Sequence, residues 1–316
     1  MHPSPSRSLA LVAGASLALL AGCGSSSDSG GDGAPASSGS ASASASGATI
    51  SVVASTNVYG DIVKQIGGAR TDVTSIISDP DQDPHSYEAN TRNQLALSRA
   101  KVVIENGGGY DDFVDRMLKS SGSSAEVINV VKFSGKTAPK GGELNEHVWY
   151  DFPTVARLAD DIAAVLGRAD PKDAAAFTAN AAAFKSRIAP LEAQEAQIKK
   201  EHGGEGIGIT EPVPLYMTEA SGLVNKTPEE FSEAVEEGSD VSPRVLRETL
   251  ALYSDKQVKA LVYNAQTSGP QTEKVQKAAK AAGIPVVPVT ETLPDGKDYL
   301  AWMTANVDAL ASALAK

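Results

Sequence analysis

The sequence predicts an α/β protein of two lobes, each built on a mostly parallel sheet, with one long helix joining them. Short apolar runs alternate with helical patterns in both halves of the chain, which is typical of βαβ units. Between the halves, apolar residues recur at helical spacing over residues 171–202. The stretch from residue 49 to residue 316 is too long for one small domain and suits two lobes of ordinary size.

Apolar runs bounded by turn residues mark the expected strands, and amphipathic patterns mark the expected helices between them. The strands are expected at residues 49–55, 72–77, 101–105 and 126–131 in the first half, and at 206–210, 259–263 and 284–289 in the second. The clearer helices are expected at residues 92–98, 111–119, 151–166, 243–253, 271–282 and 299–315. This alternation predicts lobes at residues 49–170 and 204–316, with a linking helix at 171–203.

The linking helix is expected to be the mechanical element of the molecule. At 1.5 Å per residue it would be about 45 Å long, enough to run past both lobes. Pro190 lies inside it and is expected to kink it. A single rigid helix between two lobes should permit only a small closure.

The first 22 residues have the pattern of a signal peptide. They carry Arg7 and no acid, followed by an apolar run at residues 9–20 that is too short to span a bilayer. The run leads into Leu20-Ala21-Gly22-Cys23, which resembles the lipobox of bacterial lipoprotein precursors, so Cys23 is the predicted lipidation site. An ordinary secretory signal with a chance cysteine is the alternative. Because Cys23 is the sole cysteine, a disulfide and a thiolate metal site are both excluded.

Residues 23–48 are predicted to form a lipid-anchored, disordered tether. Beyond the cysteine they contain only Gly, Ser, Ala, Asp and Pro, which cannot bury enough apolar surface to fold. A flexible coil of this length has a root-mean-square reach of roughly 25 to 30 Å. The chain is therefore expected outside the cytoplasm, attached to the membrane by lipid.

The net charge is acidic. The whole chain has 28 basic and 39 acidic residues, and removal of Arg7 with the signal peptide leaves 27 minus 39, or −12. That balance argues against nucleic acid as a partner and is compatible with a cation ligand.

Two histidines in loops marked by proline and aromatic residues are the candidate metal ligands. His85 lies in DPHSYE, after the strand expected at 72–77, and His147 lies in NEHVWYD, just before a helix. Two carboxylates follow strands in the second half: Glu211 in ITEP and Glu291 in VTETLP. Ligands of open α/β sheets gather beyond the carboxyl ends of the strands. Two imidazoles and two carboxylates suit a divalent transition ion.

Each of these residues also has a plain structural interpretation. His85 could be a surface-loop residue, His147 a core residue packed against Trp149, and Glu211 an exposed turn carboxylate. Asp295 could serve in place of Glu291. The remaining histidine of the mature chain, His202, is expected at the C-terminal end of the long helix. A partly charged imidazole there would interact favourably with the helix dipole.

The loops DPHSYE and NEHVWYD, together with the ITEP strand end and the long central helix, resemble the solute-binding proteins of zinc and manganese ABC transporters, the cluster A-I or ZnuA-like family. The resemblance covers the chain from Thr49 to Lys316. It implies a periplasmic-binding-protein-like fold with a helical backbone, metal ligands at His85, His147, Glu211 and Glu291, and an ABC permease as partner. Zinc-dedicated members often have a third histidine where this chain has Glu211, and a His/Asp-rich loop absent here. Many members have Asp where this chain has Glu291.

The resulting hypothesis is a monomeric, non-enzymatic binding protein that takes Zn²⁺ or Mn²⁺ as transported ligand. Affinity at an N/O site rises from Mn²⁺ to Zn²⁺, so zinc is expected to bind more tightly in vitro. A metallohydrolase is the rival enzyme hypothesis, but the mature chain lacks HExxH, GxSxG and a P-loop. A surface adhesin without a required metal is a second rival. A binder of an organic solute or iron chelate is a third, and it would need a larger cleft with aromatic and basic lining.

Overall fold

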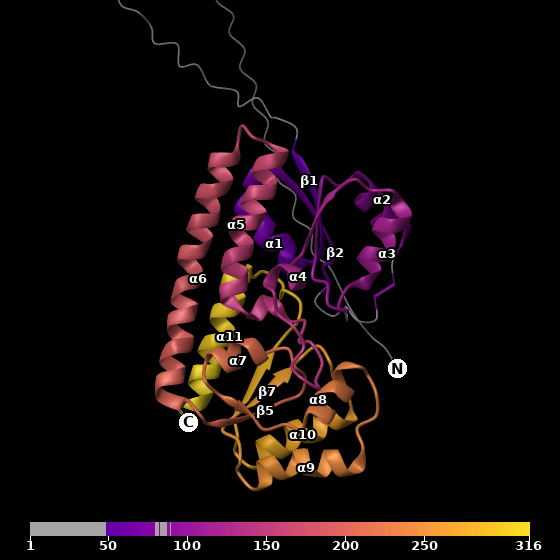
Figure 1. Cartoon of the computed structure of the whole chain (residues 1–316). Helices are drawn as coiled ribbons and strands as arrows, with labels where there is room; N and C mark the ends of the chain where they lie inside the picture. The colour runs from indigo at the N-terminus through magenta and orange to yellow at the C-terminus, as the bar shows by residue number, and fades with distance from the viewer. Residues whose placement is uncertain (1–48, 80–81, 83–86, 89) are drawn as a thin grey trace, which may run out of the picture. The chain divides into compact units, whose positions relative to one another are not determined.

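The computed structural model describes residues 49–79, 82, 87–88 and 90–316, which Figure 1 shows as ribbons. The predicted signal peptide at 1–22, the tether at 23–48 with Cys23, and the metal-ligand candidate His85 lie outside the described residues. Among the residues that are described, no helix is both long enough and apolar enough to cross a membrane.

The N-terminal lobe contains a parallel four-stranded sheet in the order β2-β1-β3-β4. Its strands are β1 (Ile50–Thr56), β2 (Thr71–Ile77), β3 (Val102–Glu105) and β4 (Glu126–Asn129). One face packs against α1 (Asn57–Gly67) and α5 (Phe152–Ala169), and the other packs against α2 (Thr91–Arg99) and α3 (Asp112–Ser121). Helices therefore cover both faces, as is usual for parallel sheets, although the edge strands β2 and β4 remain partly exposed.

The fourth strand is shorter than the sequence predicted, because its end is turned into a helix. The expected strand at 126–131 stops at Asn129, whose side chain accepts a hydrogen bond from the backbone N–H of Lys132 at 2.9 Å. This contact caps a short helix, α4 (Val130–Ser134). The two valines at its start belong to a short apolar run, and such a run fits either a strand or a helix.

The C-terminal lobe repeats the parallel arrangement in the order β6-β5-β7-β8. Its strands are β5 (Gly206–Ile209), β6 (Val224–Asn225), β7 (Leu261–Asn264) and β8 (Val286–Val289). The outer face packs against α8 (Glu229–Glu236), α9 (Pro243–Ser254) and α10 (Pro270–Ala281), and the inner face packs against α11 (Tyr299–Leu314). The sequence pattern did not predict β6, α7 (Leu215–Ala220) or α8, which are all short.

The linking helix is α6 (Ala174–His202), which continues through Pro190 and lies beside α5 and α11 (Figure 1). Its buried residues join one apolar cluster that includes Val52 and Ile104 of the first sheet and Ile209 and Val262 of the second. The lobes are therefore joined by a shared core as well as by the helix. The predicted two-lobed α/β fold with a long connecting helix is confirmed.

In both sheets the strand order reverses beside the first strand, between β1 and β3 and between β5 and β7. Such a switch point opens a crevice beyond the carboxyl ends of the strands. The segments that follow these ends contact one another across the lobes. The Tyr150 hydroxyl donates to the Thr290 carbonyl oxygen at 2.7 Å, and the Asn57 amide exchanges two hydrogen bonds of 2.9 Å with the Leu293 backbone.

Candidate metal centre

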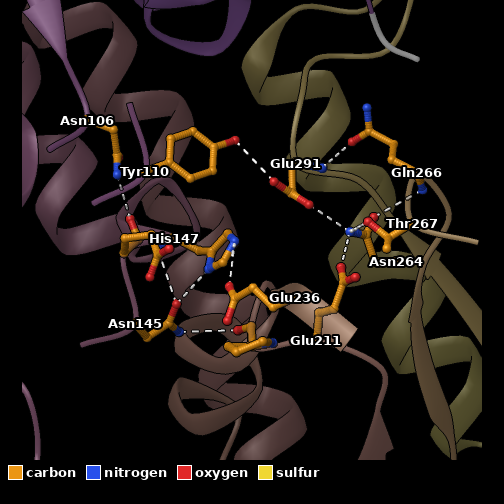
Figure 2. A network of polar contacts seen from close by, with 12 residues as sticks. Asn106, Tyr110, Asn145, His147, Glu211, Glu236, Asn264, Gln266, Thr267 and Glu291 are labelled. Carbon is orange, nitrogen blue, oxygen red and sulfur yellow. Dashed lines mark hydrogen bonds and ion pairs between the residues drawn. The ribbon is translucent and has the colours of Figure 1, made fainter. Parts of the chain in front are cut away.

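His147 is fully buried, and its ring orientation is set by one neighbouring amide. Its ring packs against those of Trp149 and Tyr110, with centroids 5.1 and 5.9 Å away. Asn145 Oδ1 lies 2.7 Å from His147 Nδ1 and accepts the His147 backbone N–H at 3.1 Å, while Asn145 Nδ2 donates to the Pro212 carbonyl oxygen at 3.2 Å (Figure 2). Because Oδ1 only accepts, the ring proton lies on Nδ1. Nε2 therefore keeps its lone pair, as a metal-binding imidazole requires.

Glu211 and Glu291 lie beyond two strands of the second sheet and share one amide. Glu211 follows β5, Glu291 follows β8, and Asn264 ends β7 between them. The Asn264 amide nitrogen donates to the Glu211 carboxylate and, at 2.8 Å, to Glu291 Oε1 (Figure 2). Both glutamates are buried, with 2% and 4% of their surfaces exposed. The strand ends thus hold two carboxyl groups close together, and Asn264 positions them.

The Glu291 segment is also fixed to the opposite lobe. The Tyr110 hydroxyl donates to Glu291 Oε2 at 3.2 Å, and burial raises the pKa of that hydroxyl well above its usual value, which keeps it a donor. Gln266 Oε1 accepts the Glu291 backbone N–H at 2.5 Å. Glu291 is therefore set by contacts from both lobes. Asp295, which the sequence offered in its place, is exposed and does not line the acidic cavity beside the site.

A glycine-rich turn brings Tyr110 to the site. Gly107, Gly108 and Gly109 all have positive φ angles, a conformation that other residues rarely adopt. The Asp111 carboxylate accepts the backbone N–H groups of Asn106 and Gly107 at 2.6 and 2.7 Å and closes the turn. The packing of Tyr110 against His147 thus depends on the glycine-rich turn that follows β3.

A cavity of about 1140 Å³ opens beside these residues, and its lining is strongly acidic. The glutamates among its described lining residues are Glu143, Glu146, Glu211, Glu219, Glu229, Glu233, Glu236, Glu237 and Glu291. The basic side chain among them is Lys136, whose amine lies 3.1 Å from Asp151 Oδ1 and 4.4 Å from the centre of the Tyr216 ring. That lysine is therefore engaged beside the cavity, and the lining favours cations over anions.

Glu236, in the last turn of α8, is a residue of the cleft that the sequence did not indicate. Its Oε1 lies 3.6 Å from His147 Nε2, and Figure 2 shows its carboxyl group directed toward the imidazole. Burial, followed by repulsion from Glu146, Glu211 and Glu291, raises its pKa to about 9. Glu236 lies in the acidic run EEFSEAVEE, which has the pattern of a solvated helix face. Nothing in that run distinguishes Glu236 from its neighbours.

The structure gathers the candidate donors in two groups. Among the described residues, donor atoms of Glu146, His147 and Glu236 all lie within 4.8 Å of one another. Glu211 and Glu291 form the second group, around Asn264. The remaining described histidine, His202, ends α6 with Nδ1 3.3 Å from Glu205 Oε2. Its structural role at the helix end fits the expectation from the sequence.

Comparison with known proteins agrees with this architecture. The family model described as "ZnuA: Zinc-uptake complex component A periplasmic" matches residues 52–313. The manganese-binding lipoprotein MntA of Bacillus subtilis is 26% identical over 243 residues, covering 74% of this chain and 77% of that protein. The iron ABC transporter substrate-binding lipoprotein MtsA of Streptococcus pyogenes is 24% identical over 301 residues, covering 84% and 89%. The relatives are thus named for different metals.

A solved structure with the same fold is the laminin-binding adhesin Lmb of Streptococcus agalactiae, at a TM-score of 0.72 and 24% identity. The alignment covers 84% of this chain and 99% of that one. At this identity the likeness establishes the fold alone. Because the family match extends over nearly all of both lobes, the chain belongs to the ZnuA family and is a substrate-binding component of a divalent-metal ABC importer, not an enzyme.

Proposed function

We propose that this chain captures Zn²⁺ or Mn²⁺ between its lobes, with His85, His147, Glu211 and Glu291 as ligands, and delivers the ion to a membrane permease. The observation that carries the proposal is the buried imidazole of His147. Its Nδ1 proton is held by Asn145, and its Nε2 lies beside a cavity lined by acids. That is the arrangement a metal-binding histidine needs, because the second-sphere partner fixes both tautomer and ring orientation.

The acidic cleft supports a bare or hydrated cation as cargo. Nine glutamates and a single engaged lysine among the described lining residues would repel anionic solutes, including anionic iron chelates. Tyr216 is the aromatic side chain of that described lining, so the stacking surface expected for an organic ring is small. The cavity chemistry therefore argues against an organic solute as cargo.

The donor types restrict the metal without choosing one. Imidazole nitrogen and carboxylate oxygen suit Zn²⁺, and carboxylates that bind through both oxygens make Mn²⁺ acceptable. Zn²⁺ is expected to bind more tightly in vitro, since affinity at such sites rises along the series from Mn²⁺ to Cu²⁺ and remains high at Zn²⁺. The metal delivered in the cell depends on availability as well as on affinity.

We also propose that the mature chain is anchored outside the cytoplasm by lipid on Cys23, with residues 24–48 as a tether. The support is the sequence pattern around Leu20-Ala21-Gly22-Cys23 and the naming of the relatives MntA and MtsA as lipoproteins. Metabolic labelling with a radioactive fatty acid tests the anchor. The wild-type chain should incorporate the label, and the Cys23→Ser variant should not.

The metal proposal is tested by native mass spectrometry of chelator-treated protein, offered Zn²⁺ and Mn²⁺ separately and then together. The expected result is one tightly bound ion per chain, with Zn²⁺ displacing Mn²⁺. His85→Ala and His147→Ala should each abolish stoichiometric uptake, while His202→Ala should not, because His202 pairs with Glu205 at the far end of α6. Failure of the wild-type chain to bind either metal would overturn the proposal.

A further inference from the structure

The contact between His147 and Glu236 has the spacing of two ligands that share an ion. Their nearest atoms, Nε2 and Oε1, are 3.6 Å apart. A hydrogen bond between them would have a heavy-atom distance of about 2.7–3.2 Å. Two neighbouring donors that each lie about 2.1 Å from one ion are roughly 3.0 to 3.4 Å apart, and the larger value applies to tetrahedral coordination. The observed separation is therefore closer to that of paired ligands than to that of a hydrogen bond.

Glu236 is held in this position by the packing of its helix. Phe231 and Val235 of α8 are buried in the apolar cluster on the outer face of the second sheet. The side chain of Glu236 leaves the last turn of α8 and lines the cavity with Glu146. Only 16% of that side chain is exposed, and its Oε1 accepts no hydrogen bond from the residues that the structure describes. A buried carboxylate oxygen without a donor needs a cation or a proton.

We propose that Glu236 is an additional ligand of the captured ion, in the position next to His147. This inference rests on the proposed function and adds a residue to its site. Since His147 belongs to the first lobe and Glu236 to the second, an ion between them is bound by both lobes at once. Together with Glu211 and Glu291 this gives three carboxylates, an oxygen-rich donor set that suits Mn²⁺ better than a set with more imidazoles does.

Mn²⁺ is the appropriate probe, because carboxylate oxygen is a ligand type that suits it. Chelator-treated wild-type protein, Glu236→Gln and Glu230→Gln are each titrated with Mn²⁺ alone. Glu230 is the matched control: it lies on the same helix, it receives the same substitution, and its exposed side chain contacts Arg244 at 2.7 Å, away from the cavity lining. Thermal unfolding of each variant without metal shows whether the fold is retained.

The expected result is a fall in Mn²⁺ affinity of about ten-fold or more for Glu236→Gln, at least the loss seen when a residue supporting a ligand is removed. Glu230→Gln should bind as the wild type does. In the Co²⁺-loaded proteins, the visible absorption of Glu236→Gln should differ from the wild-type spectrum, since a changed ligand set changes the coordination. Unchanged or higher Mn²⁺ affinity in Glu236→Gln would overturn the inference and leave the proposed function intact. A wild-type chain that binds no metal would overturn both.

Discussion

Two buried carboxyl groups, Glu236 in the cleft and Glu195 in the long helix α6, have similarly raised pKa values in different surroundings. Burial is the main cause in both, raising the pKa of Glu236 to about 9 and that of Glu195 to about 8. Glu236 lines an open cavity, and its Oε1 lies 3.6 Å from Nε2 of His147. Glu195 is buried within the helix packing and does not line that cavity. A raised pKa thus marks burial, and it indicates a ligand only where donors and a route for the ion accompany it.

A similar contrast separates the two halves of the candidate metal site. His147 is held by aromatic packing and one amide, so its geometry does not depend on an ion. Glu211 and Glu291 are held near each other by the Asn264 amide, which donates to both carboxyl groups. Four measurements test these two contrasts.

The largest effect is expected from His147→Ala. Loss of a residue that only orients a metal ligand typically lowers metal affinity by roughly 10–100-fold. Loss of the ligand itself should lower it by more. His202→Ala is the matched control, since that imidazole pairs with Glu205 at the end of α6. Competition with a chromogenic chelator measures both. Equal affinities of the two variants would show that His147 is a core residue, the plain interpretation of its packing against Trp149.

Asn264→Ala should come next, with a fall in affinity of about 10–100-fold, because it removes the amide that positions two carboxylates without removing a ligand. Asn180→Ala is a suitable control, since the Asn180 amide donates to the Ile66 carbonyl oxygen on the first lobe at 2.8 Å. Calorimetric titration of both proteins with Zn²⁺ would compare them. If Asn264→Ala kept wild-type affinity, Glu211 and Glu291 would not need their shared amide.

Metal affinity should rise with pH. Burial raises the pKa of Glu146 to about 7 and that of Glu236 to about 9, so near neutral pH in the metal-free protein Glu236 is protonated and Glu146 is partly protonated. A bound cation must displace those protons, and it also requires a neutral imidazole. Metal affinity should therefore increase as the pH is raised from 5 to 9. Titrations in non-chelating buffers across this range would show the slope. A constant affinity would contradict the assignment of these groups to the site.

Glu195→Gln is expected to change stability and leave metal affinity unaltered. The pKa of Glu195 is about 8 in the folded chain, above the ordinary value of 4.5, so only the folded state holds the proton between these values. The free energy of unfolding of the wild type should therefore fall between pH 5 and pH 9 relative to Glu195→Gln, by on the order of 2–4 kcal/mol.

Urea unfolding at pH 5 and pH 9 tests this difference, with the exposed Glu201→Gln as the control on the same helix. If Glu195→Gln and Glu201→Gln had the same pH dependence, the carboxyl of Glu195 would be solvated rather than buried. A loss of metal affinity in Glu195→Gln would contradict the distinction between the cleft and the helix.

Most of the fold follows from sequence pattern. Short apolar runs predicted seven of the strand positions, and helical spacing in residues 171–202 predicted α6. The short elements were missed because they are too short to show a hydrophobic period. Strand β6 has only two residues, Val224 and Asn225, and helix α7 has six. The predicted end of β4 was wrong because the cap formed by Asn129 decides between strand and helix after a local apolar run.

The candidate site was only partly predictable. His147, Glu211 and Glu291 were candidates from their loops and strand ends, and the structure places all three in or beside the cleft. The roles of Asn145, Asn264 and Glu236 were not predicted, because they arise from contacts across the fold. Asn264 does end the strand LVYN, so its position at the carboxyl edge of the second sheet was a usable signal.

The central claim is that one ion is bound at His147 between the lobes, and its position can be measured directly. Crystals grown with Mn²⁺ and recorded at an X-ray energy where manganese scatters anomalously would locate the ion. The expected result is one strong peak, roughly 2.0–2.3 Å from His147 Nε2, with carboxylate oxygens of the second lobe around it. A metal bound elsewhere, with His147 still packed against Trp149 and contacting no ion, would contradict the claim.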